Sequence, residues 1–406
     1  MCAGVSMEPD SRRFTAFLAS IAALTSLSID MSLPSVPAIE HDFGIAAGRG
    51  ALTMSLFLAG YAATPLVGGP LADRFGRRPV LLVSLVLFVS SAIGCSISPT
   101  FSILLACRLI QGCASGVATT MPIAIVRDML SGSAARQRLS EVTTINSIMP
   151  IVAPLIGSLV MVAGRWRILF GCQAIFAGCI VAALLLDFRE SLPKDRRHRL
   201  HPVALITNYW HLLTTRVFLG YALVNGLTFA SVFSFISVSP LILMQRMGIS
   251  RATYPLLFAL IALGGITGSL TSALLSRRHT TGRTLITTGL SLLTAAAIVG
   301  AALQIAGFHR PIAILCAVFA ALFGFGLMAP SVTIGALQPV PELAGSGSGA
   351  LRSILMICGS GTSGFLALYC GRHFMRTELA TTLTMSGTAL AAFILYLSML
   401  RTHDAT

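Results

Sequence analysis

The stretch that decides the fold is Gly69-Pro70-Leu71-Ala72-Asp73-Arg74-Phe75-Gly76-Arg77-Arg78-Pro79. It joins the end of one apolar run to the start of the next, and its glycines permit turn dihedrals and close backbone contacts that a side chain would forbid. Its charged side chains need partners at the ends of neighbouring helices, because helix termini attract the opposite charge. The stretch predicts a tight cytoplasmic hairpin between two membrane helices that acts as a latch. The latch residues within it are Gly69, Asp73, Arg74, Gly76, Arg77 and Arg78.

The composition independently indicates a membrane protein. The chain has 406 residues, of which 55% are hydrophobic and only 10% are charged, so it has more apolar surface than one water-soluble core needs. Twelve apolar runs of roughly 20 residues are long enough to cross about 30 Å of hydrocarbon. We predict an all-α membrane protein with spans near residues 14–36, 51–70, 79–98, 101–124, 141–163, 166–187, 217–240, 253–275, 283–305, 311–331, 346–369 and 378–400.

The net charge of +14 does not indicate a nucleic-acid partner. The arginines lie in short loops between apolar runs rather than along one solvated face. Alternate loops differ in their content of lysine and arginine, and the rule that cytoplasmic loops retain positive charge places both termini inside. The nine cysteines are scattered without metal-ligand spacing, so we interpret them as packing residues and expect neither a metal nor a cofactor.

The longest polar interruption runs from Arg189 to about Thr215 and divides the spans six and six. We predict an N-terminal six-helix bundle over 1–188, a cytoplasmic linker over 189–215 and a C-terminal six-helix bundle over 216–406. Two bundles joined in this way can rock against each other around a central cavity, as in transporters built from repeated halves.

Several motifs carry a family resemblance. The stretch 69–79 resembles the G-x-L-a-D-r-x-G-r-r signature between spans 2 and 3 of the major facilitator superfamily. The segment 28–37 (SIDMSLPSVP) resembles the L-s-x-D-m-y-L-P-a-x-P segment of its bicyclomycin and chloramphenicol resistance (Bcr/CflA) branch, with Ser32 replacing the tyrosine. Shorter matches occur at 166–170, 190–192 and 235–240. The resemblance implies two pseudo-symmetric six-helix bundles and exchange of drugs for protons.

Asp30 is the first candidate site residue, because an ionised acid within an apolar span costs several kcal/mol and is normally retained for an ion or substrate pathway. The alternative is that Asp30 caps or hydrogen-bonds the outer end of span 1 near Pro34.

Arg108 is the second, and it lies roughly 10 Å into span 4 at 1.5 Å per residue, a depth similar to that of Asp30. The sequence Arg108-Leu109-Ile110-Gln111-Gly112 resembles the R-x-x-q-G element of the superfamily, which implies a role for Arg108 in proton coupling. The alternative is an arginine that bonds backbone carbonyls. Burial disfavours an ionised carboxylate and a nearby arginine favours it, so motion that separates Asp30 from Arg108 would favour proton uptake.

A polar stripe follows Arg108 on span 4 at helical spacing and is a candidate lining of the substrate cavity. Small polar residues also join membrane helices, so packing is the alternative. Aromatic pairs at i, i+4 on spans 2 and 7 are candidate walls for an apolar drug, with core or lipid-facing positions as the alternative. The stripe consists of Gln111, Ser115 and Thr119, and the aromatic residues are Phe57, Tyr61, Phe229 and Phe233.

The inner end of span 4, residues 125–130 (IVRDML), resembles the a-I-v-R-D-l segment of the same branch. The resemblance adds Arg127 and Asp128 to the latch, with Asp128 paired to Arg77 or a neighbour and Asp73 at a helix N-terminus of the second bundle. Residues 150–157 (PIVAPLIG) resemble the G-P-x-x-G-G signature of drug exporters in a modified form. Prolines and small residues predict a kinked, close-packed seam there, formed by Pro150, Pro154 and Gly157.

These observations favour a proton-coupled multidrug exporter in the inner membrane of a bacterium. Its expected partners are protons and a small, partly apolar substrate. We expect a monomer surrounded by the lipid bilayer. The alternatives are an exporter of a natural metabolite, such as a sugar or amino acid derivative, and a non-transporting membrane receptor. An enzyme is not expected, because the sequence has no H-E-x-x-H, G-x-S-x-G or dinucleotide-binding motif in a suitable context.

Overall fold

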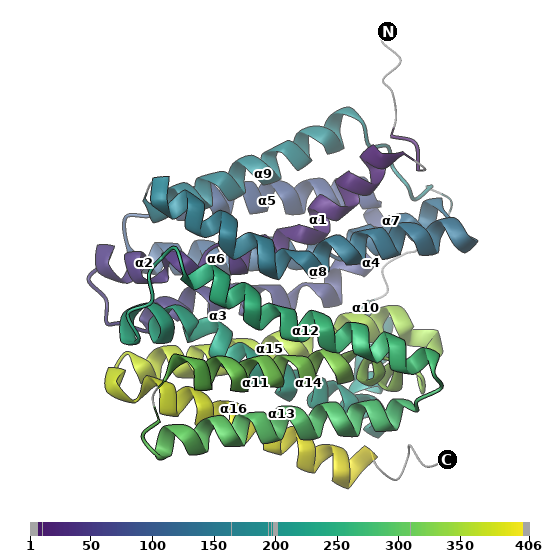
Figure 1. Ribbon diagram of the computed structural model, residues 1–406. Helices are drawn as coiled ribbons and strands as arrows, with labels where there is room; N and C mark the ends of the chain where they lie inside the picture. The colour runs from purple at the N-terminus through teal and green to yellow at the C-terminus, as the bar shows by residue number, and fades with distance from the viewer. Residues whose placement is uncertain are drawn as a thin grey trace. The chain divides into compact units, whose positions relative to one another are not determined.

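The computed structural model describes residues 7–9, 11–163, 165–193, 195, 197, 202–308 and 310–400, and every regular element in these ranges is helical (Figure 1). The α-helices are α1 (Arg12–Asp30), α2 (Val36–Asp42), α3 (Leu52–Ala63), α4 (Pro65–Phe75), α5 (Arg77–Ser96), α6 (Phe101–Ala118), α7 (Met121–Met129), α8 (Gly132–Ala163), α9 (Trp166–Leu186), α10 (Pro202–Thr214), α11 (Arg216–Pro240), α12 (Tyr254–Arg277), α13 (Gly282–Ile305), α14 (Pro311–Leu337), α15 (Ala344–Cys370) and α16 (Thr377–Leu395). Short 3₁₀ or π segments cover Leu33–Ser35, Arg49–Ala51, Leu241–Arg246, Pro341–Leu343, Phe374–Arg376 and Tyr396–Leu400.

Several helices begin where the sequence supplies a capping side chain. Ser11, Thr100 and Thr281 each accept a hydrogen bond from the backbone N–H three residues later, at the starts of α1, α6 and α13. These bonds satisfy amide groups that the first turn of a helix otherwise leaves free. Polar residues at the ends of apolar runs therefore set where these spans start.

Within the described residues, 11 helical segments are long and apolar enough to cross a membrane, and the bent pair α3–α4 makes a twelfth. The prediction of an all-α membrane protein with twelve spans is confirmed. The chain divides into two compact units, one formed by Met1–Ser32 and Leu56–Pro202 and the other by Leu33–Ser55 and Val203–Thr406. Each unit contains six spans.

Helix packing within each unit brings distant parts of the sequence together. In the first unit α5 lies between α6 and α9, and α1 packs along α8. In the second unit α11 packs against α14, α15 and α16, while α13 lies against α14 and α16. The short segment between α1 and α3 belongs to the second unit, where it packs on α11 and α15.

The second span differs from the continuous helix that the sequence predicted over 51–70. It is broken at Thr64 into α3 and α4, which are bent by 45° relative to each other. Pro65 occupies the first position of α4, where its missing N–H costs nothing but where it cannot continue the hydrogen-bond ladder of α3. The predicted hairpin over 69–79 is also mostly helical, because α4 extends to Phe75 and α5 begins at Arg77, leaving only Gly76 as the turn.

The predicted linker over 189–215 contains a helix, α10, that the polar composition did not indicate. Positions 194, 196 and 198–201 of this linker lie outside the described residues. The remainder of the linker contributes to two features described below, the latch and the exposed face of α10.

Candidate functional site

Asp30 is the last residue of α1 and only 8% of its surface is exposed. No hydrogen bond or ion pair joins its side chain to another residue of the described ranges. The end of α1 is closed instead by the backbone N–H of Met31, which donates to the carbonyls of Leu27 and Ile29. A buried carboxylate without partners is costly when ionised, so binding a proton or a cationic group at Asp30 relieves that cost. The capping alternative for Asp30 is not what the structure shows.

Arg108 is fully buried in α6, and its hydrogen bonds include one to a side chain and one to the backbone of another helix. Its Nη1 donates to Oε1 of Gln111 at 2.7 Å, and its Nη2 donates to the backbone carbonyl of Ser28 at 3.3 Å. The guanidinium carbon also lies 4.5 Å from the ring centroid of Phe57 and 5.6 Å from that of Phe170, distances at which a cation is attracted to an aromatic face.

Arg108 thus contacts the last turn of α1 through a backbone carbonyl. This contact is the one described by the alternative interpretation, in which the arginine bonds backbone carbonyls. Asp30 and Arg108 form no ion pair in this structure. Ser28 precedes Asp30 by two residues, so the arginine is bound to the same helical turn that carries the acid. The site therefore places a buried cation and an uncompensated carboxyl group on neighbouring helices without pairing them.

Each residue of the polar stripe on α6 bonds a different helix. Gln111 donates from Nε2 to Oε1 of Gln173 on α9 at 3.0 Å. The hydroxyls of Ser115 and Thr25 on α1 are 2.8 Å apart, as are those of Thr119 and Tyr61 on α3. These contacts agree with the packing alternative, in which small polar groups join membrane helices.

Two buried polar groups of the first unit lack partners among the described residues. They are Nε2 of Gln173 on α9 and Oγ of Ser158 on α8. Buried polar groups are usually hydrogen-bonded, so each retains the capacity to bind water or a ligand group.

The predicted seam on α8 packs against α1 directly beside Asp30. Pro150 and Pro154 lie inside α8, and Gly157 approaches the backbone carbonyl of Met31 so closely that a Cβ at this position would collide with it. Only glycine permits this contact. Gly157 therefore fixes the position of α8 against the residue that follows the buried acid.

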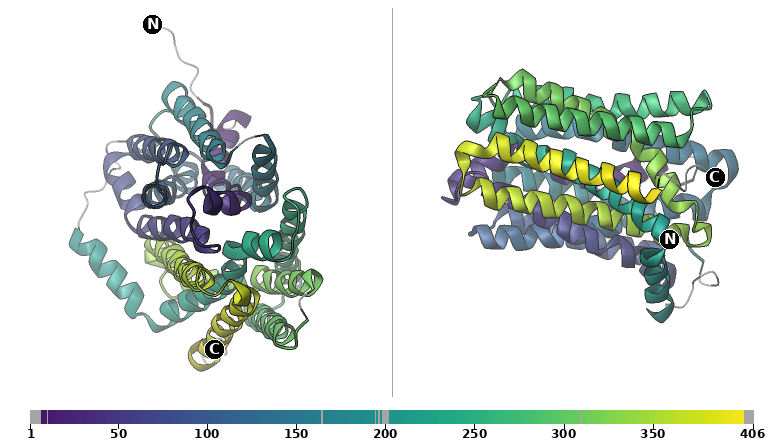
Figure 2. Two further views of the ribbon diagram at one scale, coloured as in Figure 1. Left: turned by 90° about the vertical axis from the view of Figure 1, so that its left-hand side faces the viewer. Right: turned by 90° about the horizontal axis from the view of Figure 1, so that it is seen from below.

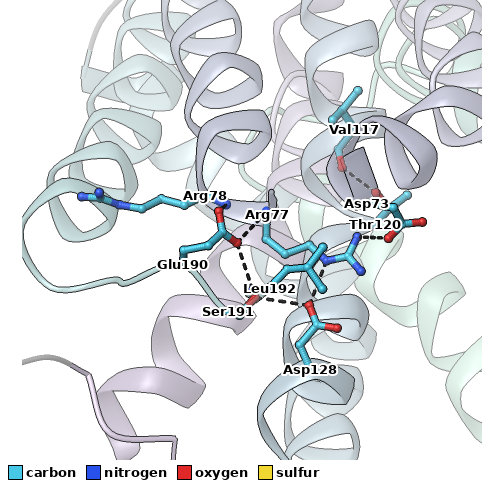
Figure 3. A network of polar contacts seen from close by, with 9 residues as sticks. All are labelled: Asp73, Arg77, Arg78, Val117, Thr120, Asp128, Glu190, Ser191 and Leu192. Carbon is cyan, nitrogen blue, oxygen red and sulfur yellow. Dashed lines mark hydrogen bonds and ion pairs between the residues drawn. The ribbon is translucent and has the colours of Figure 1, made fainter. Parts of the chain in front are cut away.

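The predicted latch contains an ion-paired cluster around Arg77 (Figure 3). Arg77 lies 2.6 Å from Asp73, one helical turn earlier, and its Nε donates to Oδ2 of Asp128 at 2.9 Å. The side chains of Arg77 and Asp128 are 9% and 16% exposed, whereas that of Asp73 is 45% exposed. The pair with Asp128, which the resemblance implied, is therefore the less screened of the two.

Glu190 is a latch residue that the sequence pattern did not identify as one. Its carboxylate accepts hydrogen bonds from the backbone N–H of Arg77 at 2.8 Å and of Arg78 at 3.3 Å (Figure 3), so it caps the positive end of α5. It also lies 3.5 Å from Nη2 of Arg197. The available signal was an acid directly after span 6, in the Glu190-Ser191-Leu192 match.

Three predicted latch residues stand apart from this cluster. Gly69 has no atom within 4 Å of the position a Cβ would take. Arg74 lies over the ring of its neighbour Phe75, with 5.1 Å between the guanidinium carbon and the ring centroid. Arg127 is exposed on α7. The structure therefore concentrates the latch on Asp73, Gly76, Arg77, Arg78 and Asp128, with Glu190 added.

Replacing Gly76 with alanine is expected to destabilise the protein by about 1–3 kcal/mol from backbone strain alone. Gly76 has φ 103° and ψ 157°, a region open essentially to glycine, and a Cβ would also collide with Oε2 of Glu190. The measurement is the melting temperature in detergent. Gly132→Ala, with φ 62° and no neighbouring atom within 4 Å, is the control for a positive φ without a collision. A loss at Gly76 no larger than the loss at Gly132 would contradict both the greater strain at Gly76 and the collision with Glu190.

The aromatic residues occupy two different environments. Phe57 and Tyr61 on α3 are fully buried, under Arg108 and beside Thr119 respectively. In the second unit, Phe229 and Phe233 on α11 stack with ring centroids 5.3 Å apart, and Phe229 also contacts Phe325 on α14 at 6.2 Å. Phe229 is half-buried, so it alone of the four presents appreciable surface.

A second buried acid, Glu40 on α2, was not identified from the sequence. It is 4% exposed and accepts hydrogen bonds from the backbone N–H of Gly48 at 2.7 Å and of Gly50 at 2.9 Å. Its other oxygen accepts from Nε2 of Gln245 at 2.8 Å. Unlike Asp30, Glu40 has hydrogen bonds on both carboxylate oxygens, which fits a structural role in the segment between α1 and α3.

Comparison with known proteins agrees with this architecture. The model of the family described as the Major Facilitator Superfamily matches residues 18–363. Multidrug resistance protein MdtL of Klebsiella pneumoniae (strain 342) is 30% identical over 389 residues, which cover 94% of this chain and 95% of the relative. The uncharacterized MFS-type transporter YdgK of Bacillus subtilis (strain 168) is 28% identical over 346 residues, 84% of this chain and 85% of the relative.

A solved structure shows the same fold at lower sequence identity. The crystal structure of a D-xylose-proton symporter superposes with a TM-score of 0.73 at 15% identity and covers 97% of this chain and 99% of that one. The family match spans both units and includes the latch, the buried acid and the buried arginine. The chain is therefore a multi-pass membrane protein that belongs to the Major Facilitator Superfamily, a family of transporters rather than enzymes.

Proposed function

We propose that this transporter is a proton-coupled multidrug exporter of the Bcr/CflA branch, which exchanges small, partly apolar compounds such as antibiotics for protons by alternating access. The observation that carries the proposal is Asp30, a carboxyl group that is 8% exposed and has no partner among the described residues. A relative over nearly the full length is named a multidrug resistance protein, which supports drugs as the substrate class.

The surroundings of Asp30 support a role in coupling rather than in packing. Arg108 binds the same turn of α1 through Ser28, and Gly157 of the exporter seam contacts the next residue, Met31. A proton bound at Asp30 changes the charge at a point where three helices meet. Two conformations that expose Asp30 differently then differ in free energy according to its protonation, which is what an exchanger requires.

The latch supplies an element that can distinguish two conformations. Its ion pairs join α4, α5 and α7, and hydrogen bonds from the backbone of α5 to Glu190 add the segment after α9. Each surface pair contributes about 1 kcal/mol or less, so a switch depends on several being made or broken together. We place the latch and both termini on the cytoplasmic side of a bacterial inner membrane, and we propose that the protein acts as a monomer with the lipid bilayer and its substrate as partners.

Drug susceptibility of a bacterium that lacks its own exporters is the direct test. Expression of this chain is expected to raise the inhibitory concentration of several unrelated, partly apolar antibiotics several-fold. Collapse of the proton gradient with an ionophore should abolish efflux of a fluorescent substrate from the same cells. A panel without any shift, combined with proton-dependent export of a sugar or amino acid derivative, would contradict the drug assignment and favour the metabolite alternative.

A further inference from the structure

Helix α10 carries an apolar face that no part of the described chain covers. Val203, Ile206, Trp210 and Leu213 are 76%, 70%, 69% and 44% exposed. Their spacing of three and four residues places them on one side of the helix, and we call them the α10 stripe. At 13 residues, or about 20 Å at 1.5 Å per residue, α10 is too short to cross about 30 Å of hydrocarbon.

The opposite side of α10 anchors it to the second unit. Leu212 is fully buried, and its Cδ2 would lie 3.8 Å from a Cβ at Gly347 of α15. Tyr209 of α10 is hydrogen-bonded to Ser346, which also lies on α15. In both views of Figure 2, α10, drawn in teal, runs across the long axes of the spans of its unit. It therefore lies along the plane in which the spans end, with its stripe facing away from the protein.

The charge of the flanking sequence indicates which kind of surface the α10 stripe contacts. The stretch between α9 and α10 carries five basic residues, Arg189, Lys194, Arg196, Arg197 and Arg199, against three acids, Asp187, Glu190 and Asp195. An exposed Arg216 follows α10. Clusters of basic residues beside membrane helices are attracted to anionic headgroups. Tryptophan is favoured at the membrane–water boundary, where one part of its ring is apolar and the other is polar.

We propose that α10 is an interfacial helix that lies in the cytoplasmic surface of the membrane and binds anionic lipid. The α10 stripe enters the boundary between headgroups and acyl chains, as amphipathic helices of this type do, and the exposed Arg216 that follows α10 meets the headgroup charge. This surface is independent of the transported compound, because it lies outside the spans and on the second unit.

The test uses Trp210 as a probe in the full-length protein. The chain has 2 tryptophans, so Trp166→Phe leaves Trp210 alone. The variant is reconstituted into vesicles of phosphatidylcholine and phosphatidylglycerol in which only one of the two lipids has brominated chains, since bromine quenches tryptophan on contact. We expect strong quenching, and more of it when the anionic lipid carries the bromine.

Three controls make the result decisive. Trp210→Phe leaves the buried Trp166 and should lose the lipid-class difference. Adding Ile206→Asn to the probe variant should weaken quenching, whereas His211→Asn, at an exposed position away from the stripe, should not. Equal quenching by the two brominated lipids would contradict a preference of α10 for anionic lipid. Quenching by aqueous acrylamide and by neither brominated lipid would contradict the interfacial position of α10. If protection of Trp210 from both quenchers depends on the ratio of protein to lipid, a second copy of the chain covers the α10 stripe, which would also overturn the proposal.

Discussion

Asp30→Asn is expected to abolish proton-driven drug export while leaving the protein folded. Asparagine is nearly the same size as aspartate, but its amide cannot take up or release a proton near neutral pH. Because the carboxylate has no hydrogen-bond or ion-pair partner among the described residues, removing its charge breaks no contact that holds α1 in place. The loss should therefore fall on coupling and not on stability.

The size of the effect follows from the energy that one proton supplies. A gradient of one pH unit provides about 1.4 kcal/mol per proton, enough for about a tenfold concentration ratio of an exchanged neutral compound. A membrane potential of about 100 mV adds about 2.3 kcal/mol for each charge that moves. Everted vesicles energised by respiration should accumulate a fluorescent drug with the native chain. With Asp30→Asn they should equilibrate it without accumulation.

Glu40→Gln is the matched control, since Glu40 is as deeply buried as Asp30 but has hydrogen bonds on both oxygens. It is expected to lower the melting temperature, because Gln cannot accept from both Gly48 and Gln245 as well as the carboxylate does, yet to retain proton-driven accumulation. Unchanged accumulation in Asp30→Asn together with a loss in Glu40→Gln would move the proton site from α1 to the segment between α1 and α3.

The positions of the spans were predictable from the sequence because an apolar run of about 20 residues has few alternatives to a helix in lipid. Predicted spans over 166–187 and 217–240 correspond to α9 and α11 within one residue at each end. The break at Thr64 was not predicted, because a proline within a long apolar run is compatible with a continuous, kinked or broken helix. Helix α10 was missed because the charges around it outweighed its short apolar periodicity.

Contacts of individual side chains were less predictable than the spans. Helical spacing placed Gln111, Ser115 and Thr119 on one face, but the rotation of α6 decides whether that face meets neighbouring helices or a cavity. Packing of all the spans sets this rotation, and it sends the three residues to α9, α1 and α3. The bond from Arg108 to the carbonyl of Ser28 was equally unpredictable. Every residue has a backbone carbonyl that can accept from a guanidinium, so the sequence does not indicate which one does.

Arg108→Lys is expected to eliminate most of the proton-driven export. Lysine keeps the charge but lacks the planar guanidinium that donates to Gln111 and to the carbonyl of Ser28 together. It also loses much of the attraction to Phe57 and Phe170, which for desolvated pairs is about 2 kcal/mol. The last turn of α1, and with it Asp30, is then no longer tied to α6. Proton-driven uptake in everted vesicles should fall, whereas counterflow of labelled drug without a proton gradient should persist.

Gln111→Leu separates positioning of Asp30 from general stability. It removes one hydrogen bond to Arg108 and leaves a buried donor without that partner, which costs about 1–3 kcal/mol, but the arginine still reaches Ser28. Melting temperature should therefore fall in both variants, while the ratio of proton-driven uptake to counterflow should fall only in Arg108→Lys. If that ratio changes equally in the two, or in neither, Arg108 serves the packing of α6 alone. If it changes only in Arg108→Lys, the arginine acts through the turn that carries the acid, and coupling depends on holding Asp30 against α6 as well as on its proton.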